Sequence, residues 1–143
     1  MGQLGPPGHA TWPYDPIMKI AASVFVGLAA LLHFFIFWME SVGWTRPEVW
    51  KRFGVADQAA ADVTRPMAYN QGFYNLFLGI GAALGLVLWW TDHDTAGRTL
   101  ALFCTGSMVA AAAVLVTTGR RYVRAALTQG TLPLVGLVLT LLV

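Results

Sequence analysis

Long apolar stretches separated by short polar segments dominate the chain. Three stretches, residues 18–39, 70–90 and 98–118, are almost uninterrupted, and a fourth over residues 121–143 carries more polar positions. An α-helix rises about 1.5 Å per residue, so each stretch is long enough to cross a hydrocarbon layer of about 30 Å. The pattern predicts an all-α fold, a four-transmembrane-helix bundle that forms one domain over residues 18–143.

The segment before the first apolar stretch, residues 1–17, is rich in Gly and Pro and contains no Lys or Arg. It therefore lacks the positively charged start of a secretory signal. We expect an extended N-terminal arm at the membrane surface, with Trp12 and Tyr14 in the headgroup layer.

The segment between the first two stretches contains helix signals. Thr45 and Glu48 have the spacing of a capping box, which predicts a short interfacial helix over residues 46–53 that ends at the following glycine. A second helical stretch over residues 57–63 is expected to end before Pro66, because the residue before a proline disfavours helical backbone.

Pro133 interrupts the fourth stretch. Its ring clashes with the carbonyl of Gln129, and its nitrogen donates no hydrogen bond. We expect a kink over residues 130–133 with Gln129 turned inward. The alternative is a break at Gly130, which would leave a short helix that crosses only part of the membrane.

Polar side chains occur at helical spacing within the first span. His33, Phe37, Glu40 and Trp44 lie on one stripe. His33 comes seven residues before Glu40 and therefore lies about 10 Å deeper. Since ionisable residues are rare inside membranes, their presence marks a functional site by default.

The second span begins with three amides, Asn70, Gln71 and Asn75. Gly72, Asn75 and Gly79 share a narrow face, where small residues let another helix approach and the amide can hydrogen-bond to it. A stripe of small residues in the third span also predicts close packing against a neighbour: Gly106, Ala110, Ala113 and Thr117.

Composition and charge agree with a membrane protein. The chain is 57% hydrophobic and 11% charged, whereas soluble domains contain about 25% charged residues. A net charge of +2 is too small to indicate binding to nucleic acid. Lys and Arg number seven on one side of the predicted membrane and two on the other, so the positive-inside rule places both termini outside the cytoplasm.

With this topology, polar residues of all four spans reach one layer in the cytoplasmic half of the bundle. We predict that this layer binds a ligand. Its candidate residues are His33, Glu40, Asn70, Gln71, Tyr74, Asn75 and Gln129. The alternative is that these groups only join the helices to one another and set their register.

Other reactive groups give weaker signals. Cys104 is the single cysteine, so a disulfide within the chain is excluded, and its place in an apolar span indicates a core residue. Asp92, His93 and Asp94 fall in the polar loop over residues 91–97, where such residues form a turn far more often than a metal site. One histidine at depth cannot supply two axial ligands to a haem. We assign no catalytic residue and no metal, and the cofactor stays unknown.

Several segments together resemble a known family. They are HFFIFWMESVGW at 33–44, FG at 53–54, NQGFYNLFL at 70–78, RR at 120–121 and QGTLPL at 129–134. The chain, except for its N-terminal arm, is similar to small bacterial four-helix membrane proteins catalogued as a domain of unknown function, number 1304. The resemblance implies a bacterial membrane protein and no particular activity. The family's characteristic polar positions correspond to His33, Glu40, Asn70, Gln71 and Asn75.

Three functions from different classes stay open. The favoured one is binding or carriage of a small amphipathic or lipid-like ligand, whose headgroup would occupy the polar layer. The chain is alternatively an accessory or assembly subunit of a larger membrane complex, or a homo-oligomer. An intramembrane enzyme would use His33 as general acid–base with Glu40 orienting it, but the chain offers no nucleophile or cofactor motif to complete such a site.

Overall fold

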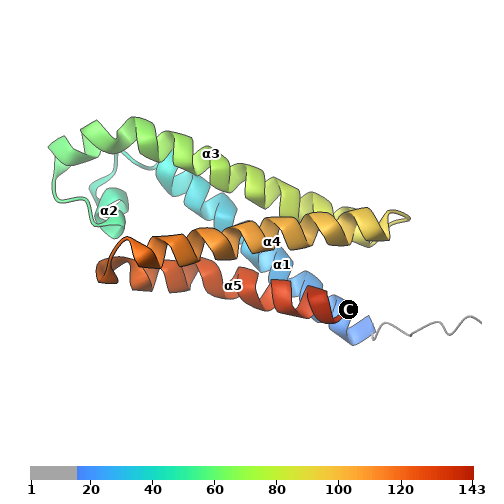
Figure 1. The fold of residues 1–143 in the computed structure, drawn as a ribbon. Helices are drawn as coiled ribbons and strands as arrows, with labels where there is room; N and C mark the ends of the chain where they lie inside the picture. Colours follow the sequence, from blue (N-terminus) through green and yellow to red (C-terminus); the bar gives the residue numbers. More distant parts are fainter. Residues whose placement is uncertain (1–15) are drawn as a thin grey trace, which may run out of the picture.

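The computed structural model describes residues 16–143, which are helical almost throughout (Figure 1). The elements are α1 (Pro16–Phe37), a π-helical turn η1 (Trp38–Val42), α2 (Pro47–Trp50), a 3-10 turn η2 (Lys51–Phe53), α3 (Gln58–Trp89), α4 (Asp94–Thr117), a 3-10 turn η3 (Arg120–Tyr122) and α5 (Val123–Leu142). Four helices, α1 with η1, α3, α4 and α5 with η3, are long and apolar enough to cross a membrane. The predicted four-helix bundle with a short helix after its first span is confirmed.

The four long helices form a ring in which α1 and α4 are diagonal neighbours. Helices α3 and α5 each pack against both of them. The core between the helices is built mainly from small side chains, so the helices approach closely: Val26, Ala29, Ala30, Ala82, Ala101, Cys104 and Met108. The interpretation of Cys104 as a core residue is confirmed.

Two prolines lie inside helices. Helix α3 continues through Pro66, so the predicted helix end before this residue is wrong. Pro66 is exposed, and the carbonyl that it leaves without a partner lies at an exposed turn where water can bind it. Helix α5 likewise continues through Pro133, which excludes the break at Gly130. Neighbouring helices hold such a proline-containing helix together, and the predicted kink stays a prediction.

The ends of the shorter elements differ from the expected ones. Helix α2 begins after Arg46, which makes no side-chain cap, so the predicted capping box at Thr45 is wrong. Gly54 ends the short helical segment with a left-handed φ of 74°, as predicted. Of the predicted N-terminal arm, residues 1–15, with Trp12 and Tyr14, lie outside the described residues. Pro16 and Ile17 are the first residues of α1.

Helices α3 and α4 touch where glycine removes the side chain. A Cβ on Gly85 would lie 2.8 Å from the backbone nitrogen of Ala101, and one on Gly97 would lie 2.6 Å from the carbonyl carbon of Leu88. The stripe of small residues that was predicted in the third span does not form this contact between α3 and α4. Ala110, Ala113 and Thr117 of that stripe are exposed, because the opposite half of α4 faces α3.

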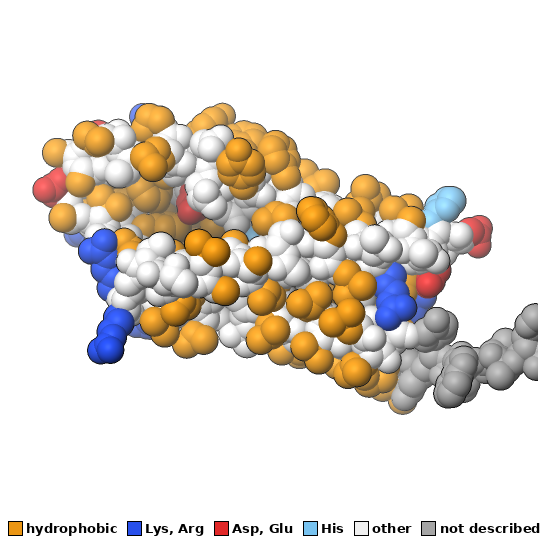
Figure 2. All heavy atoms as spheres, viewed as in Figure 1, with side chains coloured by type: hydrophobic (Ala, Val, Ile, Leu, Met, Phe, Trp, Pro, Cys, Tyr) orange, Lys and Arg blue, Asp and Glu red, His pale blue; other side chains and the backbone are white. Residues whose placement is uncertain are grey.

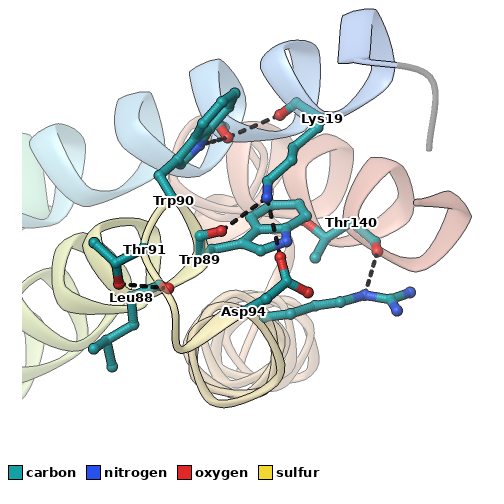
Figure 3. A network of polar contacts seen from close by, with 9 residues as sticks. Lys19, Leu88, Trp89, Trp90, Thr91, Asp94 and Thr140 are labelled. Carbon is teal, nitrogen blue, oxygen red and sulfur yellow. Dashed lines mark hydrogen bonds and ion pairs between the residues drawn. The ribbon is translucent and has the colours of Figure 1, made fainter. Parts of the chain in front are cut away.

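A network of polar contacts closes the same end of the bundle (Figure 3). The Lys19 ammonium donates to the backbone carbonyl of Trp89 at 2.8 Å and pairs with Asp94 at 3.0 Å. It also lies 4.9 Å from the ring centroid of Trp90, whose indole N–H donates to Ser23 at 2.8 Å. A cation at the carbonyl end of a helix is favourable, so Lys19 joins α1 to the ends of α3 and α4.

Replacing Lys19 with Met should lower the unfolding free energy more than replacing Asp94 with Asn. Lys19 serves a carbonyl and two indole rings besides its ion pair, so we expect losses of about 1–2 kcal/mol and less than about 1 kcal/mol respectively. Unfolding by SDS in mixed micelles, followed by circular dichroism, measures both values. Equal losses would show that the ion pair is the whole contribution of Lys19.

Replacing Gly97 with Ala should destabilise the bundle by about 1–3 kcal/mol, because the added methyl meets backbone atoms that cannot rotate away. Gly106→Ala is the matched control on the same helix. Its Cβ would have only the Leu137 side chain within reach, at 4.0 Å, and alanine favours helix by about 1 kcal/mol. The same SDS titration should give changes of opposite sign, and a neutral Gly97→Ala would contradict the close crossing.

Candidate functional site

Helix α3 stays in contact with α1 and η1 along the other half of the bundle. A Cβ on Gly79 would lie 3.2 Å from the carbonyl oxygen of Ala30, and a Cβ on Gly72 would lie 3.1 Å from the Cβ of Glu40. Asn75 lies between these glycines and is buried. The face of Gly72, Asn75 and Gly79 therefore packs closely against its neighbour, as the sequence predicted.

The π-helical turn η1 brings Glu40 to this contact. Its wide hydrogen bond runs from the Gly43 N–H to the Trp38 carbonyl, at 2.7 Å. The Ser41 hydroxyl then donates to the Tyr69 carbonyl of α3 at 2.9 Å, which fastens η1 to α3. Single π turns within helices are frequent at functional sites. The sequence analysis did not predict this turn, because its residues also suit an α-helix.

Glu40 and Asn75 form the central polar pair of this half. The Asn75 amide donates to the Glu40 carboxylate at 2.9 Å and to the Gln71 backbone carbonyl at 3.2 Å. Glu40 is 8% exposed and Asn75 is 9% exposed. The buried Glu40 carboxyl group accepts one hydrogen bond, from Asn75. Its second oxygen makes no hydrogen bond within residues 16–143.

His33 lies deeper on α1 and is 3% exposed. Its Nδ1 is 2.9 Å from the backbone carbonyl oxygen of Ala29. Because a carbonyl only accepts, Nδ1 carries a hydrogen, and in neutral histidine Nε2 is then an acceptor. No residue in the described range bonds to Nε2.

These free atoms are not fully buried. Among residues 16–143, only the Trp50 indole nitrogen is a fully buried side-chain nitrogen or oxygen without a partner. The free atoms of His33, Glu40 and Asn75 therefore retain contact with the surface, although the residues themselves are buried.

Helices α3 and α4 diverge beside this polar pair. Gly81 faces Cys104 across the helix contact. Seven residues before Gly81 on α3, Tyr74 is 57% exposed. Seven residues after Cys104 on α4, Ala111 is also exposed. From Tyr74 and Ala111 onward, the facing sides of α3 and α4 no longer bury each other. Figure 1 shows the two helices separating, and Figure 2 shows the hollow that results, with an acidic side chain in it.

The structure places the predicted site residues in three groups. His33, Glu40 and Asn75 are buried. Gln129 is half-buried on α5, four residues before the buried Pro133, and its inward orientation stays a prediction. The other three are exposed on α3, beside the polar pair: Asn70, Gln71 and Tyr74. Only Glu40 and Asn75 bond to each other through their side chains.

The segment after η1 forms a second apolar cluster over the start of α3. Trp44 and Trp50 are buried there with Ala61 and Ala68, and the Trp44 indole donates to the Ala61 carbonyl at 3.0 Å. This cluster holds α2 beside the hollow. The predicted apolar side of the short helix is the signal that could have located it.

Metal ligands do not gather in the part of the chain that the structure describes. No group of three or more His, Cys, Asp or Glu residues within residues 16–143 is placed to hold a metal ion. His93 and Asp94 flank the turn between α3 and α4, and Asp94 pairs with Lys19.

The family comparison covers most of the described residues. Residues 27–141 match the family model described as Protein of unknown function (DUF1304). The chain belongs to the DUF1304 family. Comparison with curated proteins and with solved structures found no match. Since the family description names no activity, the function of this DUF1304 protein has to be argued from the hollow and its polar pair.

Replacing Asn75 with Ala should destabilise the DUF1304 protein, because the Glu40 carboxyl loses its donor. Hydrogen bonds between membrane helices contribute about 0.6 kcal/mol on average and up to about 1.7 kcal/mol, and we expect the upper part of this range. Asn70→Ala, an exposed amide on the same helix, should change the unfolding free energy by less than about 0.5 kcal/mol. SDS unfolding measures both, and equal effects would contradict a structural role for the Glu40–Asn75 bond.

Proposed function

We propose that this DUF1304 protein binds, or carries, a small amphipathic ligand in the hollow between α3 and α4. The observation that supports this most directly is the Glu40–Asn75 pair, which is buried but keeps hydrogen-bonding atoms that have no protein partner and are not fully buried. Polar groups at membrane depth are costly unless they are used. A ligand headgroup would use them.

The polar wall of the proposed site comes from three helices. Glu40 and His33 belong to the first span, Gln71 and Asn75 to α3, and Gln129 to α5. Asn70 and Tyr74 would border the opening, because both are exposed on the side of α3 that α4 leaves uncovered.

The apolar wall comes from the end of α4. Leu115 is half-buried there, Ala111 is exposed, and Val114 is 63% exposed. Helix α4 keeps its contact with α5, since a Cβ on Gly130 would lie 2.8 Å from the Cβ of Ala112. A ligand tail could lie along α4 without separating this pair.

We further propose that the protein lies in the bacterial plasma membrane with both termini outside the cytoplasm. Its basic residues support this orientation: η2 and η3, which carry four of the nine Lys and Arg, adjoin the open end, and the positive-inside rule would make that end cytoplasmic. Lys19 and Arg98 occupy the closed end, where both donate to helix carbonyls. The hollow would then open in the inner leaflet.

A role as an accessory subunit of a membrane complex is the second candidate. Val63 and Met67 lie on the same side of α3 as Tyr74 and are 78% and 73% exposed. A helix of a partner protein could cover this stripe in place of a ligand tail.

Photolabelling of the full chain in phosphatidylcholine nanodiscs tests the ligand proposal. The probe is hexadecanol with a diazirine on its chain. We expect labels to concentrate near Tyr74 and Ala111, and Glu40→Ala or Asn75→Ala to reduce them about fivefold, as loss of a buried hydrogen-bonding group would. Melting temperatures of the variants show whether they are folded.

The matched control is Glu48→Ala, which removes an exposed carboxylate from α2 and should leave labelling unchanged. Labels spread evenly over the lipid-facing sides of all helices, whatever residue stands at position 40, would overturn the proposal. A stoichiometric partner protein cross-linked along Val63 and Met67 would favour the accessory role instead.

A further inference from the structure

The Glu40–Asn75 pair leaves only acceptors free. Both hydrogens of the Asn75 amide are used, one on the Glu40 carboxylate and one on the Gln71 carbonyl. The amide oxygen of Asn75 therefore stays available, and an amide oxygen only accepts. The second oxygen of Glu40 is also available, and it accepts when the carboxyl group is ionised.

His33 adds a third acceptor in its neutral form. Its Nδ1 hydrogen is used on the Ala29 carbonyl, which leaves the lone pair of Nε2. The nearest hydroxyl on η1, that of Ser41, donates its hydrogen to the Tyr69 carbonyl. With Glu40 ionised, the free atoms of His33, Glu40 and Asn75 are thus acceptors, while the buried Trp50 indole N–H is an unused donor in the same half of the bundle.

No cation of the described chain compensates Glu40. Within residues 16–143 the Lys19–Asp94 pair is the one ion pair, and it lies at the closed end. Near the hollow, Arg46 lies over the Trp38 ring at 5.4 Å and Lys51 over the Trp50 ring at 5.5 Å. A carboxylate at membrane depth without a counter-ion is costly.

We infer that the headgroup bound by Glu40 and Asn75 is a primary ammonium on an apolar chain; this rests on the proposed ligand site. An ammonium supplies three donors and the missing positive charge. Anionic headgroups would set acceptor against acceptor. A quaternary ammonium has charge but no N–H to donate. A primary ammonium on an apolar chain occurs both in free long-chain amines and in phosphatidylethanolamine.

Competition against the photoreactive hexadecanol tests this inference. The competitors share a twelve-carbon chain: dodecylamine, dodecyltrimethylammonium, dodecanol and dodecanoate. Dodecylamine should halve the labelling at a concentration about tenfold lower than the other three require, because only it offers charge-assisted N–H donors. Since dodecyltrimethylammonium carries the same charge into the same bilayer, the difference between the two cations reports hydrogen bonding.

Glu40→Gln provides the residue-level test. The amide oxygen of Gln still accepts from Asn75, so this variant should fold, and its melting temperature checks that it does. It should lose the about tenfold preference for dodecylamine, whereas Glu48→Gln should keep it. Nanodiscs that contain phosphatidylethanolamine separate the two sources: reduced labelling there indicates the phospholipid, and competition by dodecylamine alone indicates a free amine.

The failures are distinguishable. If dodecanol or dodecanoate competes as well as dodecylamine while labelling still depends on Glu40, the ammonium inference is wrong and the ligand site stands. If no competitor reduces labelling and no variant changes it, both proposals are wrong.

Discussion

The distance between α3 and its two neighbours depends on the size of the side chains that α3 places between them. Toward α1, the face carries Gly79 and Gly72, and contact persists as far as η1. Toward α4, the face begins with Gly85 and Gly81 and continues with Tyr74. Where the glycines end, Tyr74 is exposed, and α4 no longer covers this face of α3 (Figure 1).

The hollow and the polar pair are two results of this asymmetry. Contact with α1 places Asn75 against Glu40, and loss of contact with α4 leaves the free atoms of both open. The closed end shows the opposite solution. There, Lys19 and Arg98 donate to the carbonyl ends of α3 and α5, so these polar groups satisfy one another.

An amphipathic ligand would suit the proposed site because its walls differ in character. The first span and α3 offer hydrogen-bond acceptors, whereas the end of α4 offers alanine, valine and leucine. Binding at Glu40 would also compensate a charge that the described chain leaves without a counter-ion. The same stripe on α3 suits a partner helix less well at Asn70, where an exposed amide interrupts the apolar residues.

Sequence alone determined the class of the protein, the four spans and the close face of Gly72, Asn75 and Gly79. These follow from local properties: length, apolarity and helical spacing. It also selected His33, Glu40 and Asn75, because such residues are rare at membrane depth. It misplaced the contact of the third span, since the stripe with Ala110 and Ala113 is as small as the stripe that α4 uses. It also ended a helix before Pro66, although that helix continues at an exposed turn.

Tertiary structure alone decided which of the polar residues meet. The spacing already placed Asn75 on the close face, but not that Glu40 would be the group across from it, because the π turn that presents Glu40 has no local signature. The hollow depends on the angle between α3 and α4. That angle results from side chains of both helices acting together, so no single stretch of the sequence contains it.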